Sequence, residues 1–157
     1  MAKKCLLLLA AALFPGCGKP DVAPAAGSAF AALQQRGQTA MGVDQYASAH
    51  VFEPLPDGGR IVLQMKETNA GEEKKIRDHM RTIAAAFASG DFSLPGFVHA
   101  GEVPGTTGMT RLRETISYTA RDLERGGEVR VTTNHPDAVK AIHEFLAFQA
   151  ADHHAGH

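Results

Sequence analysis

This chain of 157 residues has no tryptophan and only two tyrosines, and these scarcities narrow what the protein can be. Few aromatic side chains argue against the stacking platforms on which single-stranded nucleic acids bind. Its 16 basic and 17 acidic residues give a formal net charge of −1, so the composition lacks the basic excess that nucleic acid requires. We therefore expect no nucleic-acid partner.

Cysteine is also scarce, because the two cysteines lie at positions 5 and 17 and none follows. The region able to form a domain therefore has no disulfide, no thiolate metal ligand and no cysteine nucleophile. Long apolar runs are missing as well. The run from Cys5 to Leu13 is shorter than the roughly 20 residues that cross a bilayer.

The N-terminus is nevertheless typical of a bacterial lipoprotein signal. Lys3-Lys4 precede the short apolar run, and Gly16-Cys17 follow it. We expect residues 1–16 to be removed and Cys17 to carry a lipid that holds the protein at the periplasmic face of the cell envelope. By resemblance to lipoproteins of Gram-negative bacteria, the outer membrane is favoured because Gly18, not Asp, follows the cysteine.

Plain secretion stays open as the alternative. Phe14 and Pro15 occupy places where lipoproteins usually carry leucine and a small residue. Residues 17–27 are rich in Pro, Ala and Gly and are expected to tether the protein to the membrane. Residues 28–157 are then expected to form one domain, which is long enough to bury a core.

That domain contains the same pattern twice, two strands followed by a helix. The strands are expected at 49–55, 60–66, 114–123 and 128–133, with turns at 56–59 and 124–127 that each contain Gly-Gly. Helices are expected at 29–40, at 71–88, and from Pro136 onward after a cap at Asn134 or His135. Gly90 is expected to end the second helix.

The repeat predicts an α+β fold, in which a four-stranded antiparallel sheet carries two helices on one face and a further helix precedes it. The second helix has its apolar stripe at 76, 80, 83 and 87, and the last helix has one at 139, 142, 143, 146 and 150. Residues 93–108, rich in Gly and Pro, are expected to form a long loop of the kind that is often functional.

His79 and His143 are the first candidates for chemistry, because each falls on the apolar stripe of a predicted helix. At about 100° per residue, each lies beside the apolar residues three and four positions away. If the repeat sets the two helices side by side, the two imidazoles can share a metal ion. For either histidine alone we favour a core side chain that bonds a backbone carbonyl, and for the matched pair this explanation and a shared metal ion stay equally open.

His50 and His99 are the candidates to complete a set of three or four ligands, and Met80 and Met109 are possible soft ligands. Without thiols, such a site favours copper first and zinc second. The core interpretation remains open for both methionines, as does a surface position for His99. His135 most simply caps a helix. The tail from Asp152 to His157 is either a weak separate site or a solvated end, and we favour the solvated end.

Motifs for catalysis are incomplete. His143-Glu144 begins like a zinc-protease motif, but Ala147 stands where the second histidine is needed. The sequence has no G-x-S-x-G nucleophile motif and no phosphate loop with Gly-Lys-Ser/Thr. We therefore lean against an enzyme.

Short motifs run along nearly the whole mature chain. They are Ala40-Met41-Gly42-x-Asp44-Gln45, His50-x-Phe52, Gly90-Asp91-Phe92, Val98-His99, Val103-Pro104-Gly105, and Ala141-Ile142-His143-x-Phe145-Leu146-x-Phe148-Gln149. They resemble a family of small exported bacterial proteins and lipoproteins, some labelled aspartate carbamoyltransferase. That label implies a two-domain enzyme longer than this chain, and its Ser-Thr-Arg-Thr-Arg motif is barely matched by Met109–Arg113.

Three functions remain open on this sequence. The first is a membrane-anchored periplasmic protein that binds copper or zinc through His79, His143, His50 and His99, for sequestration or delivery. The second is a module that binds a small molecule or an envelope protein and has structural histidines. The third is a small metalloenzyme that uses the same histidines with one open coordination position.

Overall fold

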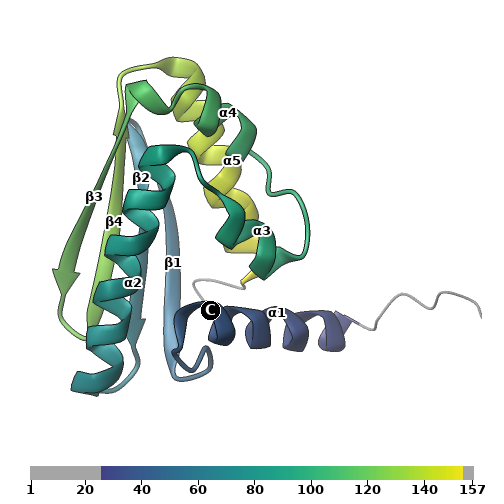
Figure 1. Cartoon of the computed structure of the whole chain (residues 1–157), viewed down its shortest axis with the longest axis vertical. Coiled ribbons are helices and arrows are strands. Elements are labelled where there is room, and N and C mark those ends of the chain that lie inside the picture. Colours follow the sequence, from purple (N-terminus) through teal and green to yellow (C-terminus); the bar gives the residue numbers. More distant parts are fainter. Residues whose placement is uncertain (1–25, 154–157) are drawn as a thin grey trace, which may run out of the picture.

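A computed structural model describes residues 26–153, which form the predicted α+β fold (Figure 1). In chain order the elements are α1 (Ala26–Met41), β1 (Ser48–Leu55), β2 (Gly58–Met65), α2 (Ala70–Ser89), α3 (Ser93–His99), α4 (Thr106–Arg111), the 3₁₀ turn η1 (Arg113–Thr115), β3 (Ile116–Leu123), β4 (Gly126–Thr133) and α5 (Pro136–Asp152). The predicted signal segment, the lipid site at Cys17 and most of the tether lie outside the described residues.

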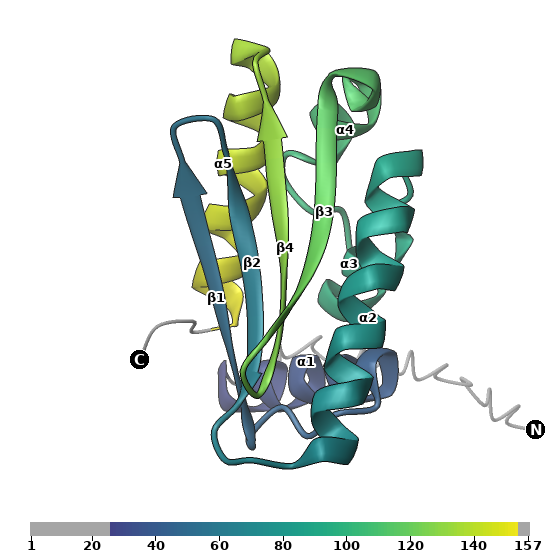
Figure 2. The same cartoon turned by 90° about the vertical axis from the view of Figure 1, so that its left-hand side faces the viewer.

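The sheet has the order β1-β2-β4-β3, and every neighbouring pair is antiparallel. The two predicted hairpins are therefore joined through their second strands, so β2 and β4 are the central strands of the sheet. Alternation assigns Ile61, Leu63 and Met65 of β2 to one face, where all three are buried. Figure 2 views the sheet from its other face, which no helix in the described part of the chain covers.

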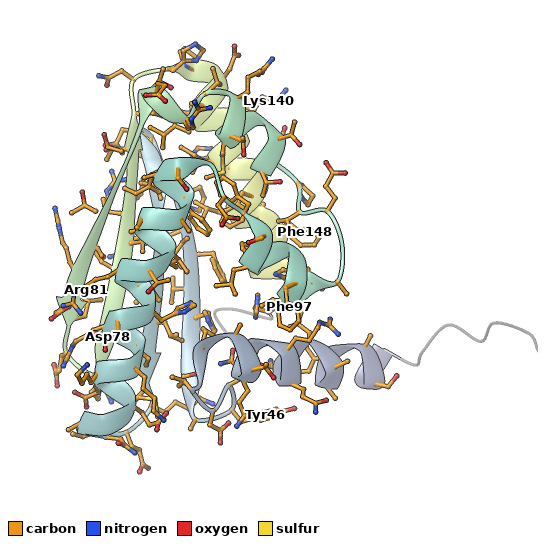
Figure 3. The ribbon with its side chains drawn as sticks, viewed as in Figure 1. Tyr46, Asp78, Arg81, Phe97, Lys140 and Phe148 are labelled. Atoms are coloured by element: carbon orange, nitrogen blue, oxygen red, sulfur yellow. The ribbon has the colours of Figure 1, made fainter. Side chains whose placement is uncertain are left out.

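Each helix packs on the hairpin of the other repeat. Helix α2 follows β1 and β2 in the chain but lies mainly against β3 and β4, whereas α5 follows β3 and β4 but lies mainly against β1 and β2 (Figure 2). On the β3 side of α2, Arg81 Nη2 lies 2.6 Å from Asp122 Oδ1, and Figure 3 shows Arg81 and Asp78 at this outer surface. The two repeats are therefore interlocked.

Two glycines on the helix side of the sheet let the helices approach it closely. A Cβ at Gly59 of β2 would lie 2.2 Å from Leu146 Cδ1 of α5 and 2.8 Å from the carbonyl oxygen of Glu53. A Cβ at Gly127 of β4 would lie 3.2 Å from Met80 Cγ of α2. Each repeat thus supplies one glycine under the helix of the other repeat.

The turns are shorter than the sequence predicts. Leu55 pairs with Gly58, and Leu123 pairs with Gly126, so only residues 56–57 and 124–125 form the hairpin loops. The Gly-Gly pairs open the following strands instead of forming the turns. A Cβ at Gly58 would lie 2.3 Å from the Val131 carbonyl oxygen, and close packing of the two central strands explains this glycine.

The predicted end of α2 at Gly90 and the predicted cap of α5 at His135 are confirmed, and the cap of α2 is Asn69. Asn69 caps α2 by accepting the N–H of Glu72 at 3.2 Å, and Gly90 ends it in the left-handed conformation, with φ 83°. His135 caps α5, because its Nδ1 accepts the N–H of Asp137 at 3.2 Å, and Pro136 takes the first helical position.

The prediction of a long loop over residues 93–108 is wrong, because this stretch contains α3 and the first half of α4. Buried contacts from Pro95, Val98 and Met109 hold these short helices on the core and outweigh the weak helix propensity of the segment. Glycine helps here too, since a Cβ at Gly105 would lie 2.2 Å from the Ala141 carbonyl oxygen of α5.

Helix α1 lies across the end of the sheet at which β1 begins (Figures 1 and 2). It packs chiefly on α3, where Arg36 Nε donates to the Val98 carbonyl oxygen at 2.6 Å. Among the helices between residues 26 and 153, none has both the length and the apolar character needed to cross a bilayer.

The glycine contacts yield a graded test. We expect Gly59→Ala to lower the free energy of unfolding by about 1–3 kcal/mol, because its new methyl group meets a backbone oxygen that cannot move aside. Gly127→Ala should cost less, because its new methyl group would lie 3.2 Å from the Arg121 carbonyl oxygen and 3.2 Å from the Met80 side chain, which can shift, whereas the backbone oxygen near Gly59 lies at 2.8 Å. Gly101→Ala, where nothing lies within 4 Å, is the control and should change little. Urea unfolding measures all three, and equal stability of the three variants would contradict the close-approach explanation.

Candidate functional site

Four histidines line one cavity of about 70 Å³ near the end of the sheet that α1 covers. They come from separate elements: His50 from β1, His79 from α2, His99 from the end of α3, and His153 from the residue after α5. Segments more than 100 residues apart in the chain therefore meet here.

The remaining lining is almost wholly apolar. It consists of Ala40, Met41, Phe52, Ile61, Met80, Ile83, Phe87, Leu94, Pro95, Val98, Phe145 and Gln149. Within the described residues, the lining includes no hydroxyl, thiol or carboxylate and no lysine or arginine. The imidazoles, the two thioethers and the Gln149 amide are thus the only side-chain groups in this described lining that can act as ligands or proton carriers.

The ring of His153 lies between those of His50 and His99. Its centroid is 5.0 Å from that of His50 and 5.1 Å from that of His99. His50 is held in place from the sheet side, because it points to the helix-covered face with Phe52 and its ring stacks on Phe52 at 5.6 Å. Three of the four imidazoles therefore form a continuous row.

His99 is held by contacts from the end of α5. Its side chain is only 2% exposed, and its Nδ1 lies 2.5 Å from the carboxylate of Asp152 at the end of α5. Its Nε2 lies 3.0 Å from Gln149 Oε1, and the ring of Phe148 packs edge-on at 5.0 Å. Figure 3 shows Phe148 beside α3. A carboxylate behind an imidazole fixes the ring and its tautomer.

Gln149 completes this arrangement. It is buried, and among residues 26–153 its Nε2 has no hydrogen-bond partner. When the proton of a neutral His99 sits on Nδ1 facing Asp152, its Nε2 is an acceptor, and a half-turn of the Gln149 amide then lets Nε2 of that amide donate to it. When His99 carries both protons, the amide oxygen accepts instead. Gln149 can therefore accommodate either state of His99.

Burial keeps two of the rings uncharged. Desolvation lowers the pKa of His79 to about 4. Desolvation together with the neighbouring His153 and His79 lowers the pKa of His50 to about 3. Both imidazoles are therefore neutral near pH 7 and have lone pairs available.

The sequence finds three of the four cavity histidines, His50, His79 and His99, and misses His153. His153 and its neighbour Asp152 were assigned to a solvated end, whereas His153 lines the cavity and Asp152 holds His99. The missed signal is a helical spacing, since Phe145, Gln149 and His153 follow one another at four-residue steps on one face of α5. His154 and His157 lie outside the described residues.

His143 does not join the other three predicted ligands. It is not part of the cavity lining, and its Nε2 lies 2.9 Å from the carbonyl oxygen of Leu55, at the end of β1. The predicted stripe of α5 is rotated, because Ala138, Ala141 and Phe145 are buried where Val139 and His143 were expected to be. His143 therefore has the contact that the sequence analysis gave as its structural explanation.

The repeat explains this position. When the N-caps Asn69 and His135 are aligned, His143 corresponds to Arg77. Arg77 Nη2 donates to the carbonyl oxygen of Leu123 at 2.9 Å, at the end of β3. Each helix thus satisfies the last carbonyl of the first strand in the hairpin beneath it, one with a guanidinium and the other with an imidazole.

By the same alignment His79 corresponds to Phe145, not to His143, and Met80 corresponds to Leu146. The alignment is supported by the two glycines, since Met80 covers Gly127 as Leu146 covers Gly59. On the strands, His50 corresponds to Tyr118, the third residue of β3. The two histidines thus have aromatic counterparts in the second repeat, and the cavity has no equivalent histidine pair there.

The two methionines named from the sequence have different positions. Met80 is 2% exposed and lines the cavity, whereas Met109 is 1% exposed, belongs to the core and does not line the cavity. Met41, at the end of α1, adds a second thioether to the lining.

The rings are not arranged around a common point. Within residues 26–153, no group of three or more histidine, cysteine, aspartate or glutamate side chains is already placed to hold a metal ion. The cavity thus brings imidazoles together without imposing a coordination geometry on them.

Comparisons with known proteins add no assignment: no protein-family model, no curated protein and no solved structure matches this chain.

The low pKa values of His50 and His79 predict an acid-labile fold. The unfolded chain binds protons at these rings near pH 6.5 and the folded chain only near pH 3 and 4, so stability falls as the pH drops from about 6.5 to 4. Between pH 7 and pH 5, each ring should cost the metal-free protein about 2 kcal/mol.

Urea unfolding at the two pH values measures this loss. His79→Phe, which introduces the residue found at the equivalent place in the other repeat, should remove about half of it. His135→Ala, a change outside the cavity, should retain it. An unchanged pH dependence in His79→Phe would contradict the burial of a neutral imidazole.

Proposed function

We propose that this protein binds one transition-metal ion, with copper favoured over zinc, in the cavity formed by His50, His79, His99 and His153. The observation that carries the proposal is the convergence of four imidazoles from four separate elements on one small apolar cavity. Imidazole is the commonest metal ligand in proteins, and a buried one needs a partner for its nitrogens.

The size of the cavity favours an ion over an organic ligand. Pockets for drug-sized molecules have volumes of about 300–1,000 Å³, whereas this cavity has about 70 Å³. Its lining also offers no reactive group beyond the imidazoles, and this favours holding or delivering the ion over catalysis.

The spacing of the rings is compatible with a shared ion. A metal–nitrogen bond of about 2.1 Å places an imidazole centroid roughly 3 Å from the metal, so two tetrahedral ligands have centroids about 5 Å apart. The distances of 5.0 and 5.1 Å about His153 match this value. Binding still requires the rings to turn, and His99 must exchange Gln149 for the ion at Nε2.

Asp152 has a supporting role in this proposal. Metal-bound histidines usually donate their other N–H to a carboxylate or a carbonyl, which orients the ring and raises its basicity. Asp152 already meets Nδ1 of His99, so Nε2 is the nitrogen left for the ion. His50, His79 and His153 would then supply further ligands from the same lining.

Location remains part of the proposal. The signal-like N-terminus and Cys17 favour a lipid-anchored protein at the periplasmic face of the outer membrane, where it would sequester a metal or deliver it to an envelope partner.

Metal analysis tests the proposed function. We expect the full-length chain, with Cys5 and Cys17 changed to serine so that no thiol contributes, to bind one copper or zinc ion and to melt at a higher temperature with the ion. His50→Phe and His79→Phe should each lower the affinity at least tenfold because each removes a ligand.

Two variants serve as controls for this measurement. His135→Ala should keep the wild-type affinity. His143→Ala should lose stability, since it leaves the Leu55 carbonyl without its partner, and should still bind the ion. Failure of the parent chain to bind either metal above background would refute the function.

Membrane attachment has its own test. Cys17→Ser removes the thiol that would be acylated, so the protein should move from the membrane fraction to the soluble fraction or stay unprocessed. Immunoblots of fractionated cell envelopes measure this shift. Equal membrane partition of Cys17→Ser and the wild type would rule out the lipid anchor and leave export untouched.

A further inference from the structure

If the cavity binds a metal ion as proposed above, the absence of charged groups from its described lining restricts which ion it can hold. Among the described residues, no carboxylate, lysine or arginine lines the cavity. The carboxylate that touches the site, Asp152, has a side chain that is 45% exposed and meets the ring of His99 at Nδ1. Among the described residues, Asp152 behind His99 is therefore the one carboxylate near the site that offsets the charge of a bound ion, and no charged group faces the ion from the lining.

Such a charge is costly in apolar surroundings, and the cost depends on the square of the charge. A divalent ion moved from water into a medium of low dielectric constant loses about four times the solvation free energy that a monovalent ion of the same size loses. Zn²⁺ and Cu²⁺ sites commonly offset this loss with carboxylate or thiolate ligands. This cavity offers neither, so its lining favours a monovalent ion.

A thioether in the lining points in the same direction. Met80 is buried against Gly127, and Gly127 lies in one row across the sheet with Leu63 and His50. Met80 is therefore placed above the same row of the sheet that presents the His50 ring. Thioether sulfur is a soft ligand that selects Cu⁺ over the harder divalent ions.

We propose that the cavity selects the cuprous ion, Cu⁺, over Zn²⁺ and Cu²⁺, and that the sulfur of Met80 is a ligand together with the imidazoles of His50 and His79. An apolar cavity penalises a single positive charge less than a double one, and the soft sulfur favours copper in its cuprous state. Met80 thus determines specificity at the site.

The chain provides a matched pair of variants for the test. Met80 and Met109 are equally buried, but only Met80 lines the cavity. Leucine is the residue that the other repeat carries at the position of Met80, since Leu146 covers Gly59 as Met80 covers Gly127. Met80→Leu is therefore expected to fold, and Met109→Leu controls for the loss of a buried thioether.

The experiment measures Cu⁺ affinity anaerobically by competition with a chromogenic Cu⁺ chelator, and Zn²⁺ affinity by competition with a zinc dye, in the full-length chain without Cys5 and Cys17. We expect Cu⁺ to bind at least a thousandfold more tightly than Zn²⁺. Met80→Leu should weaken Cu⁺ binding at least tenfold and leave Zn²⁺ binding unchanged, whereas Met109→Leu should change neither.

X-ray absorption of the Cu⁺-loaded parent chain should show a copper–sulfur distance near 2.3 Å. This measurement decides the question even if Met80→Leu fails to fold. Zn²⁺ binding as tight as Cu⁺ binding, a copper shell without sulfur, or a sulfur shell that survives Met80→Leu and vanishes in Met41→Leu would each overturn the inference while leaving metal binding intact. A chain that binds no metal at all would instead refute the proposed function.

Discussion

Close contact between each helix and the central strands is the constraint on which the rest of this fold depends. At Gly59 and Gly127 there is no side chain to hold the helices away, so Leu146 and Met80 lie directly on the sheet. This contact fixes the depth of both helices. It therefore also fixes how far His79, one residue from Met80, can reach toward the β1 strand that presents His50.

The cavity arises where the two repeats cease to be alike. Phe145 and Tyr118 occupy, in the second repeat, the places of His79 and His50 in the first. The connections differ as well, because α3 and α4 separate the repeats and α1 precedes them. Helices α1 and α3 close the end of the sheet over the histidines, and their apolar side chains desolvate the rings. Burial and neutrality of the imidazoles thus have the same structural cause.

The sequence predicted the fold well because the periodicities that govern it are local. Alternation located the strands, and the stripe of α2 at 76, 80, 83 and 87 matches residues that are buried. The caps at His135 and Gly90 could also be predicted from the sequence, because each depends on one residue and its near neighbours in the chain. The face of α5 that is buried could not be predicted from the sequence. Alanines of α5 pack inward against α4, and these contacts depend on a segment that no local pattern in α5 reveals.

The candidate site was predictable in part for a similar reason. Helical spacing predicts which face of a helix is buried, and it identifies His79 on α2. Which residues His79 then contacts depends on the elements that pack against α2, and spacing along one helix does not predict these. Pairing His79 with His143 assumed equivalent positions in the two repeats, whereas the equivalent of His143 is Arg77. His153 was missed because the polar residues from Asp152 onward indicate a solvated end, whereas the spacing of Phe145 and Gln149 along α5 continues to His153 in the cavity lining.

The exchange of helices between the repeats also has a consequence for folding. Each helix packs mainly on the hairpin of the other repeat. The first half of the chain would therefore bury little apolar surface if it folded without the second half. The face of β1 and β2 is covered only when the last segment, Pro136–Asp152, docks on strands that lie some 80 residues earlier in the chain. Such long-range closure delays folding. Loss of the final helix would therefore uncover the face of β1 and β2, while α2 would keep its contacts with β3 and β4.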